Sequence, residues 1–81
     1  MNLIVKVIPR SNKIVAIHFS DGFTANLDVS PFIKGGISER LRDPSVFNDV
    51  HVDEFGGISW ANGFDFCPNF LRAYLQSNQP D

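Results

Sequence analysis

Three short segments at the start of the chain alternate hydrophobic and polar residues, and this alternation predicts β-strands. They run over residues 3–8, 14–19 and 23–28, and β-branched residues, which favour strands, are frequent in the first two. Turn-forming residues occupy 9–13 and 20–22. The pattern therefore predicts an antiparallel three-stranded meander.

The register of each hairpin follows from which residues must share a face. For the second hairpin, a three-residue loop over 20–22 gives Gly22 the positive φ that a type I turn with a bulge requires. It pairs Phe19 with Phe23, Ile17 with Ala25 and Val15 with Leu27. For the first hairpin, a five-residue loop pairs Val7 with Val15, Val5 with Ile17 and Leu3 with Phe19. One face of the predicted sheet is then wholly apolar.

The opposite face of this sheet carries three isoleucines, Ile4, Ile8 and Ile14, among polar residues. Isoleucines on a water-facing surface indicate a covering element or a partner. Three alternatives remain open at this point: another part of the chain covers them, a second molecule contacts them, or they are tolerated in water. These three isoleucines are the predicted partner-binding residues.

Short helices are predicted in the middle of the chain, where Ser30 and Asp43 each precede a proline. In each pair a capping side chain is followed by a residue whose φ already suits a helix. Ile37 and Leu41 are expected to share a face at helical spacing. These segments are too short to be stable alone and depend on docking.

A second β-hairpin is predicted over residues 50–60, where valine, isoleucine and tryptophan alternate with polar residues. A loop over 54–56 pairs Val52 with Ile58, although a two-residue turn at 56–57 remains an alternative. Residues 68–76 are predicted to form a C-terminal helix, and 77–81 are expected to be frayed. Residues 1–81 are thus predicted to be a single α+β domain: an antiparallel meander, short helical turns, a second β-hairpin and a C-terminal helix.

Composition narrows the class of protein. The chain has 81 residues, of which 43% are hydrophobic and 20% charged, a globular balance. Cys67 is the only cysteine, which excludes an internal disulfide and favours a cytoplasmic location. Lys6 interrupts the first apolar run, so no membrane association is expected. Seven basic residues against nine acidic ones argue against nucleic-acid binding by this domain alone.

Catalytic and metal-binding motifs are absent from the sequence. No ligand spacing typical of a metal site occurs, so neither a metal nor a cofactor is expected. Cys67 stands next to the helix start but has no placed base. One polar set remains as a candidate site for a small ligand or an enzymatic reaction, provided that its members surround one concave pocket. This set consists of Asp21, Asp28, Asn62 and Asp65.

Aromatic residues are the unusual feature, with eight phenylalanines, one tryptophan and one tyrosine. Phe64 and Phe66 flank Asp65, an alternation that allows both rings to face inward and the carboxylate outward. A small core needs large side chains, so core packing is one interpretation. Exposed aromatics gathered in a patch would instead indicate protein recognition.

Several of these segments together resemble a family of small bacterial proteins of unknown function. The resemblance covers nearly the whole chain and is carried by F-S-D-G at 19–22, by W-x-N-G-x-D at 60–65 and by Pro68. Cys67 departs from the acidic or small polar residue associated with the family before this proline. The resemblance implies an α+β domain without established catalysis, occasional fusion to a helix-turn-helix domain, and frequent genomic pairing with another small protein. It suggests a regulatory or antitoxin-type module.

Size and resemblance together predict a non-enzymatic protein-binding or regulatory module, one half of a two-protein pair. So small a chain is marginally stable alone, and a partner would add stability. The predicted partner is a second small protein or another copy of the chain. The alternative is a small-ligand-binding or enzymatic domain with the polar site named above.

Overall fold

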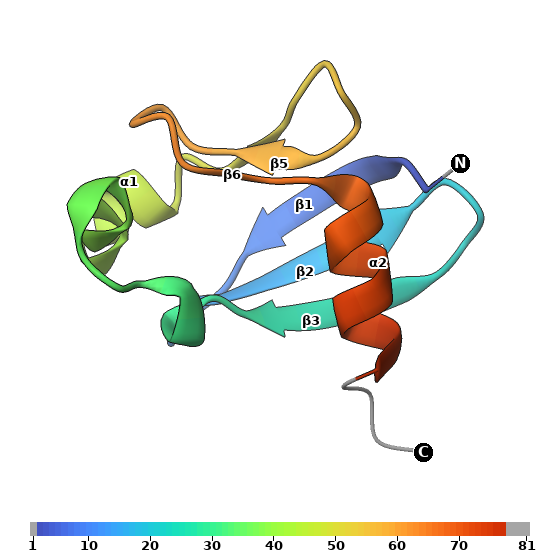
Figure 1. Ribbon diagram of the computed structural model, residues 1–81, viewed down its shortest axis with the longest axis horizontal. Coiled ribbons are helices and arrows are strands. Elements are labelled where there is room, and N and C mark those ends of the chain that lie inside the picture. Colours follow the sequence, from blue (N-terminus) through green and yellow to red (C-terminus); the bar gives the residue numbers. More distant parts are fainter. Residues whose placement is uncertain (1, 78–81) are drawn as a thin grey trace.

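The fold consists of two three-stranded antiparallel sheets, a set of short helices and one longer C-terminal helix (Figure 1). We describe residues 2–77 of a computed structural model. The expected fraying at 77–81 falls mostly outside these residues, and Ser77 is the last residue of the C-terminal helix. The α+β class predicted from the sequence is confirmed.

The first sheet is a meander of β1 (Ile4–Pro9), β2 (Ile14–Phe19) and β3 (Thr24–Asp28), in that order. The predicted register of the second hairpin is confirmed, with Val15 opposite Leu27 and Ile17 opposite Ala25. The N–H of Phe19 donates to the carbonyl of Phe23 at 2.8 Å, and Gly22 has the required positive φ of 96°. Turn chemistry and hydrophobic pattern agree here, so the register is well determined.

The predicted register of the first hairpin is wrong by two residues, because the turn is shorter than expected. Val7 lies opposite Ile17 and Pro9 opposite Val15. The N–H of Arg10 donates to the carbonyl of Ile14 at 2.7 Å, which leaves a tight turn of residues 11–13. Left-handed backbone at two consecutive residues, with φ of 61° and 62° at 12 and 13, makes this turn possible.

An irregularity between Ile4 and Lys6 changes which side chains face the core. A bulge puts two residues of one strand opposite one of the other, so the alternation is reset. Ile4 turns inward and is 2% exposed, whereas Val5 is 60% exposed. The N–H of Ile4 donates to the carbonyl of Gly56, which joins β1 to the second sheet.

The second sheet consists of β4 (His51–Val52), β5 (Ile58–Ser59) and β6 (Asp65–Phe66). The predicted pairing of Val52 with Ile58 is confirmed, which rules out the alternative two-residue turn. The third strand was not predicted: Phe66 lies opposite Ile58 after a turn in which Gly63 has a φ of 96°. This turn brings β6 alongside β5.

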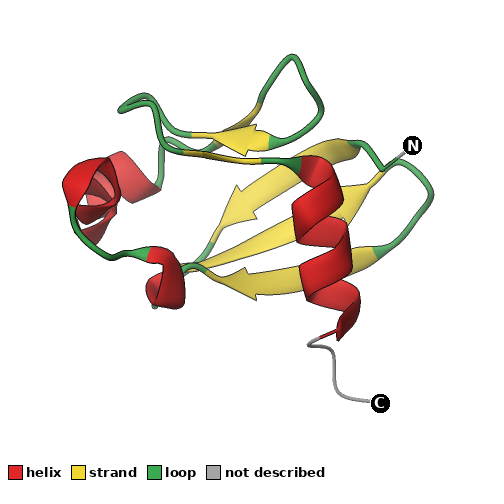
Figure 2. Cartoon of the chain, in the orientation of Figure 1, coloured by secondary structure: helices red, strands yellow, loops and turns green. Residues whose placement is uncertain are grey.

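Short helices occupy one end of the molecule: η1 (Ser30–Phe32), η2 (Gly36–Arg42) and α1 (Pro44–Phe47), of which the first two are 3₁₀ helices (Figure 2). Asp43 caps α1 as predicted, since its carboxylate accepts the N–H of Ser45. Ser30 makes no cap bond, and the carboxylate of Asp28 instead accepts its N–H at 3.0 Å.

The prediction that Ile37 and Leu41 share a face is wrong. Leu41 is fully buried, whereas Ile37 is 54% exposed. A 3₁₀ helix repeats every three residues, so Ser38 rather than Ile37 aligns with Leu41. Ser38 is buried accordingly, and its hydroxyl donates to the carbonyl of Gly35 at 2.7 Å.

The C-terminal helix α2 (Pro68–Ser77) crosses one face of the first sheet, as Figure 1 shows. Leu71 and Leu75 point into the core and Tyr74 is partly buried, in agreement with the predicted apolar stripe. One hydrophobic cluster joins both sheets, the short helices and α2. Its buried members are Ile4, Val15, Ile17, Phe19, Leu27, Val29, Ile33, Leu41, Phe47, Val50, Ile58, Trp60, Phe66, Leu71 and Leu75.

Candidate functional site

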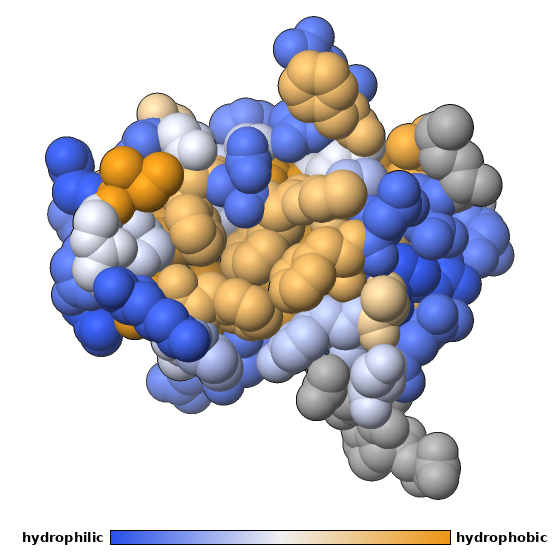
Figure 3. Space-filling model, in the orientation of Figure 1, coloured by the Kyte–Doolittle hydropathy of each residue, from blue (hydrophilic) through white to orange (hydrophobic). Residues whose placement is uncertain are grey.

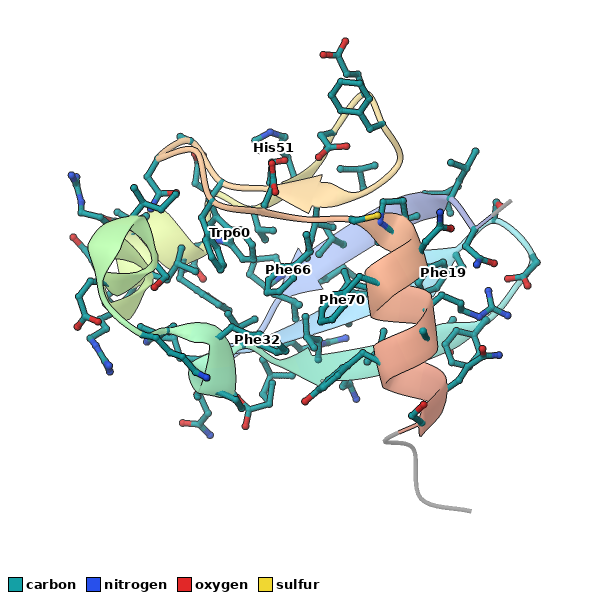
Figure 4. All side chains as sticks on the ribbon, in the orientation of Figure 1. Phe19, Phe32, His51, Trp60, Phe66 and Phe70 are labelled. Carbon is teal, nitrogen blue, oxygen red and sulfur yellow. The ribbon has the colours of Figure 1, made fainter. Side chains whose placement is uncertain are left out.

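An aromatic cluster lies where η1, β6 and α2 meet. Four of its rings form what we call the aromatic face: Phe32, Phe66, Phe70 and Tyr74. Phe66 and Phe70 stack with centroids 6.3 Å apart and an interplanar angle of 7°, and Phe70 stacks on Tyr74 at 5.9 Å and 23°. Phe32 is steeply inclined to all three of the others, at centroid distances of 5.1, 6.1 and 5.3 Å and interplanar angles of 82°, 86° and 70°. In Figure 4 the labelled rings of Phe32, Phe66 and Phe70 gather between η1 and α2.

The aromatic face is open to solvent at its centre. Phe70 is 47% exposed, and Phe32 and Tyr74 are half-buried. Figure 3 shows apolar atoms extending across the middle of this side of the molecule, bordered by polar residues. Contiguous apolar surface with a polar border is typical of protein-binding sites.

Local sequence explains how each element presents its rings. Phe70 and Tyr74 are four residues apart on α2 and so lie on one side of the helix. Phe64 and Phe66 alternate with Asp65 along β6, which places both rings on one side and leaves the carboxylate exposed, as predicted.

Trp60 supports the face from below. It is 2% exposed, and its indole N–H donates to the carbonyl of Phe47 at 2.8 Å. Its ring lies 5.7 Å from Phe64 and 6.0 Å from Phe66. Phe66, on which the exposed ring of Phe70 stacks, therefore packs against an indole that is fixed by a hydrogen bond.

A second exposed ring is carried by the loop between β4 and β5. Phe55 is 77% exposed, and the loop that carries it is organised by Asp53. The carboxylate of Asp53 accepts the N–H of Phe55 at 2.9 Å, the N–H of Gly57 at 3.0 Å and the hydroxyl of Ser59 at 2.6 Å. The Ser59 hydroxyl, followed by these two N–H groups, lowers the pKa of Asp53 below its ordinary value. These bonds favour the ionised carboxylate.

The four predicted polar residues do not surround one pocket. Asp21 accepts two hydrogen bonds from the guanidinium of Arg72, at 3.0 and 2.8 Å, and one from the N–H of Phe23 at 3.2 Å. The pKa of Asp21 is lowered, chiefly by Arg72. Asp28 accepts the N–H of Ser30 and so starts η1. Asp28 thus serves a local turn, whereas Asp21 also ties the β2–β3 turn to α2 through Arg72.

The other two polar residues lie near β6 but serve different surroundings. The amide of Asn62 donates to the carbonyl of Ile37 at 2.7 Å, and its oxygen accepts the N–H of Phe64 at 3.3 Å. Asp65 is exposed and lines a shallow depression of about 200 Å³ together with Phe55 and Cys67. Asn62 lines a separate depression beside η2 and α1. The geometry gives no common site.

The isoleucine face is smaller than the sequence suggested. Ile4 belongs to the core because the bulge in β1 turns it inward. Ile8 and Ile14 remain on the outer face of the first sheet and are half-buried. The surface predicted from three isoleucines therefore contains two.

The family model described as "Protein of unknown function (DUF2442)" matches residues 4–77. The chain belongs to the DUF2442 family. No match was found among curated proteins or among solved structures. Membership confirms the family resemblance seen in the sequence and assigns no activity, so functional argument rests on the geometry of this DUF2442 domain.

The motif residues that carry the resemblance serve the turns of the DUF2442 fold. Asp21 and Gly22 shape the turn between β2 and β3, and Asn62 and Gly63 shape the turn between β5 and β6. Trp60 fills the core. None of these five residues belongs to the aromatic face, whose residues the sequence motifs do not mark.

Metal ligands do not gather in the described part of the domain. Within residues 2–77, no three His, Cys, Asp or Glu side chains lie close enough to hold an ion. His51 is exposed on β4, where Figure 4 shows it on the smaller sheet, and its Nδ1 lies 3.3 Å from the carbonyl of Asp49. Cys67 is exposed. None of the helices in this range is long and apolar enough to cross a membrane.

Proposed function

We propose that this DUF2442 domain is a non-enzymatic protein-binding module whose aromatic face contacts a second small protein. The observation that carries the proposal is the stack of Phe66, Phe70 and Tyr74, in which Phe70 is 47% exposed, Tyr74 is half-buried and Phe66 anchors the stack in the core, with Phe32 nearly perpendicular to Phe66. Rings that are already ordered lose little side-chain entropy on binding, which favours association.

Aromatic residues suit this role because they combine a large apolar area with few rotatable bonds. Protein interfaces are enriched in such residues, and a few well-packed rings at the centre of an interface contribute most of the binding energy. A polar surround, visible in Figure 3, excludes water once a partner is in place. The isoleucine face, with only two half-buried isoleucines, offers less apolar area.

A second protein is favoured over another copy of the chain by what the family resemblance implies, namely frequent genomic pairing with another small protein. In such a pair this domain would act as the regulatory, antitoxin-like member. Partner binding would also supply stability that a domain of this size has in short supply.

The test is co-expression of the tagged chain with the small protein encoded beside it, followed by co-purification and titration of the purified pair. Phe70→Glu is expected to weaken the complex by about tenfold or more, the scale of a central interface residue. The fold should survive, because the Phe70 side chain is half in water.

Two matched variants locate the surface. Val5→Glu introduces the same charge at a 60% exposed apolar residue outside the face and should leave affinity unchanged. Ile8→Glu does so on the isoleucine face and should also have little effect. Loss of binding with Ile8→Glu alone would move the interface there, and self-association of the isolated chain that Phe70→Glu abolishes would replace the second protein by another copy.

A further inference from the structure

A depression lies between the β1–β2 turn and α1. Its volume is about 370 Å³, within the range of small-molecule sites. Arg10 and Lys13 contribute its only charged side chains, and no carboxylate lines it. The remaining lining residues are Pro9, Ser11, Asn12, Pro44, Phe47 and Asn48.

The turn that lines this depression contains backbone N–H groups without a hydrogen-bond partner. Within residues 2–77, the N–H groups of Ser11, Asn12 and Lys13 make no hydrogen bond, since the turn is closed only by Arg10 and Ile14. Consecutive free N–H groups in a turn attract anions. Two cationic side chains at the same turn add to this attraction.

Lys13 occupies a backbone conformation that a lysine rarely adopts. Its φ is 62°, and in a turn of this kind glycine is the favoured residue. Its ammonium lies 5.7 Å from the centroid of the Phe47 ring, so the charge is held against the wall of the depression. A residue that is costly for the backbone thus supplies a positive charge at the site.

We propose that this depression binds the phosphate group of a small phosphate monoester. A dianion matches two cationic side chains and several N–H donors, and the two prolines of the lining offer apolar contact to the organic part. The chain carries a net charge of −2, so a general electrostatic attraction for anions does not account for such binding. The proposal is independent of the aromatic face.

The test is a titration of the ¹⁵N-labelled full chain with phenyl phosphate at low ionic strength, followed by amide chemical shifts. Saturable shifts are expected at residues 11–14 and 48, with a Kd of about 1–10 mM. Inorganic phosphate should shift the same amides with weaker affinity, and phenol should shift none of them. Equal affinity for phosphate and phenyl phosphate would contradict the monoester.

Variants separate the site from general charge effects. Arg10→Gln and Lys13→Gly should each weaken binding by about threefold or more, the scale of losing one exposed ion pair. Lys13→Gly should at the same time raise the melting temperature, because glycine suits the backbone there. Lys34→Gln makes the same charge change outside the depression and should leave affinity unchanged. The absence of saturable shifts, or an equal loss with Lys34→Gln, would overturn the proposal.

Discussion

Gly57 is the position where the second sheet tolerates no side chain. A Cβ built there would overlap the backbone carbonyl oxygen of Phe66 and lie 3.1 Å from Cδ of Pro68. Neither neighbour can rotate away, because one is the backbone of β6 and the other is a ring at the start of α2. Gly57→Ala therefore has to push β6 away from β5, and with it the ring of Phe66.

Overpacking of this kind costs about 1–3 kcal/mol, and a backbone neighbour places Gly57→Ala at the upper end of that range. For a domain of this size, such a loss lowers the melting temperature by roughly 10–20 °C. Thermal unfolding followed by circular dichroism measures the change.

Gly56→Ala is the matched control. Its Cβ meets chiefly the side chain of Leu3, which is exposed and can rotate, so its cost comes from the positive φ of 81° and amounts to about 1 kcal/mol. A Gly57→Ala protein that melts within a few degrees of the wild type, or no lower than Gly56→Ala, would refute the steric argument.

Substitutions at three further residues probe contacts around the same framework. Trp60→Phe removes the indole donor to the carbonyl of Phe47 and leaves space in the core, which should cost about 2–4 kcal/mol in urea unfolding; a loss below about 1 kcal/mol would contradict this. The pKa of Asp53 is lowered by folding, so its contribution is present above the unfolded pKa of about 3.9 and is lost as the pH falls below it. Unfolding measured from pH 7 to pH 3 should show a steeper loss of stability in the wild type than in Asp53→Asn, and parallel curves would exclude this role. Arg72 is 14% exposed, its Nε has no partner among the described residues, and its guanidinium lies 4.2 Å from the Phe23 ring centroid. Arg72→Met keeps the aliphatic packing and should melt close to the wild type, whereas Arg72→Ala should melt clearly lower; equal melting temperatures would show that packing is not what Arg72 contributes.

Sequence reasoning succeeded where turn chemistry and hydrophobic alternation agree. The β2–β3 register followed from Gly22 and the pairing of apolar residues, and the cap at Asp43 followed from the proline after it. It failed in β1, where residues 3, 4, 5, 7 and 8 are all apolar and alternation does not distinguish the two faces. The bulge there occurs where Ile4 donates a hydrogen bond to Gly56, a contact between distant segments.

The candidate sites were also harder to predict, because contacts between distant segments of the chain form them. The aromatic face combines residues from η1, β6 and α2, and only the four-residue spacing of Phe70 and Tyr74 is visible in the sequence. The strand β6 has two residues, too few for a strand signal, although the alternation around Asp65 correctly placed its rings. The depression next to α1 depends on a turn two residues shorter than the one predicted.

Apart from Phe66, which belongs to both the core and the aromatic face, the residues that hold the fold differ from those proposed for recognition. The motif residues shape turns and fill the core, so substituting Trp60 or Gly63 changes the fold and with it every surface. Phe70 is 47% exposed, and Lys13 lies in a turn that glycine would suit better. Replacing either residue therefore removes a contact and leaves the fold in place. Loss of function in a folded Phe70 or Lys13 variant can therefore be assigned to recognition, and the two proposed surfaces can be tested independently of each other.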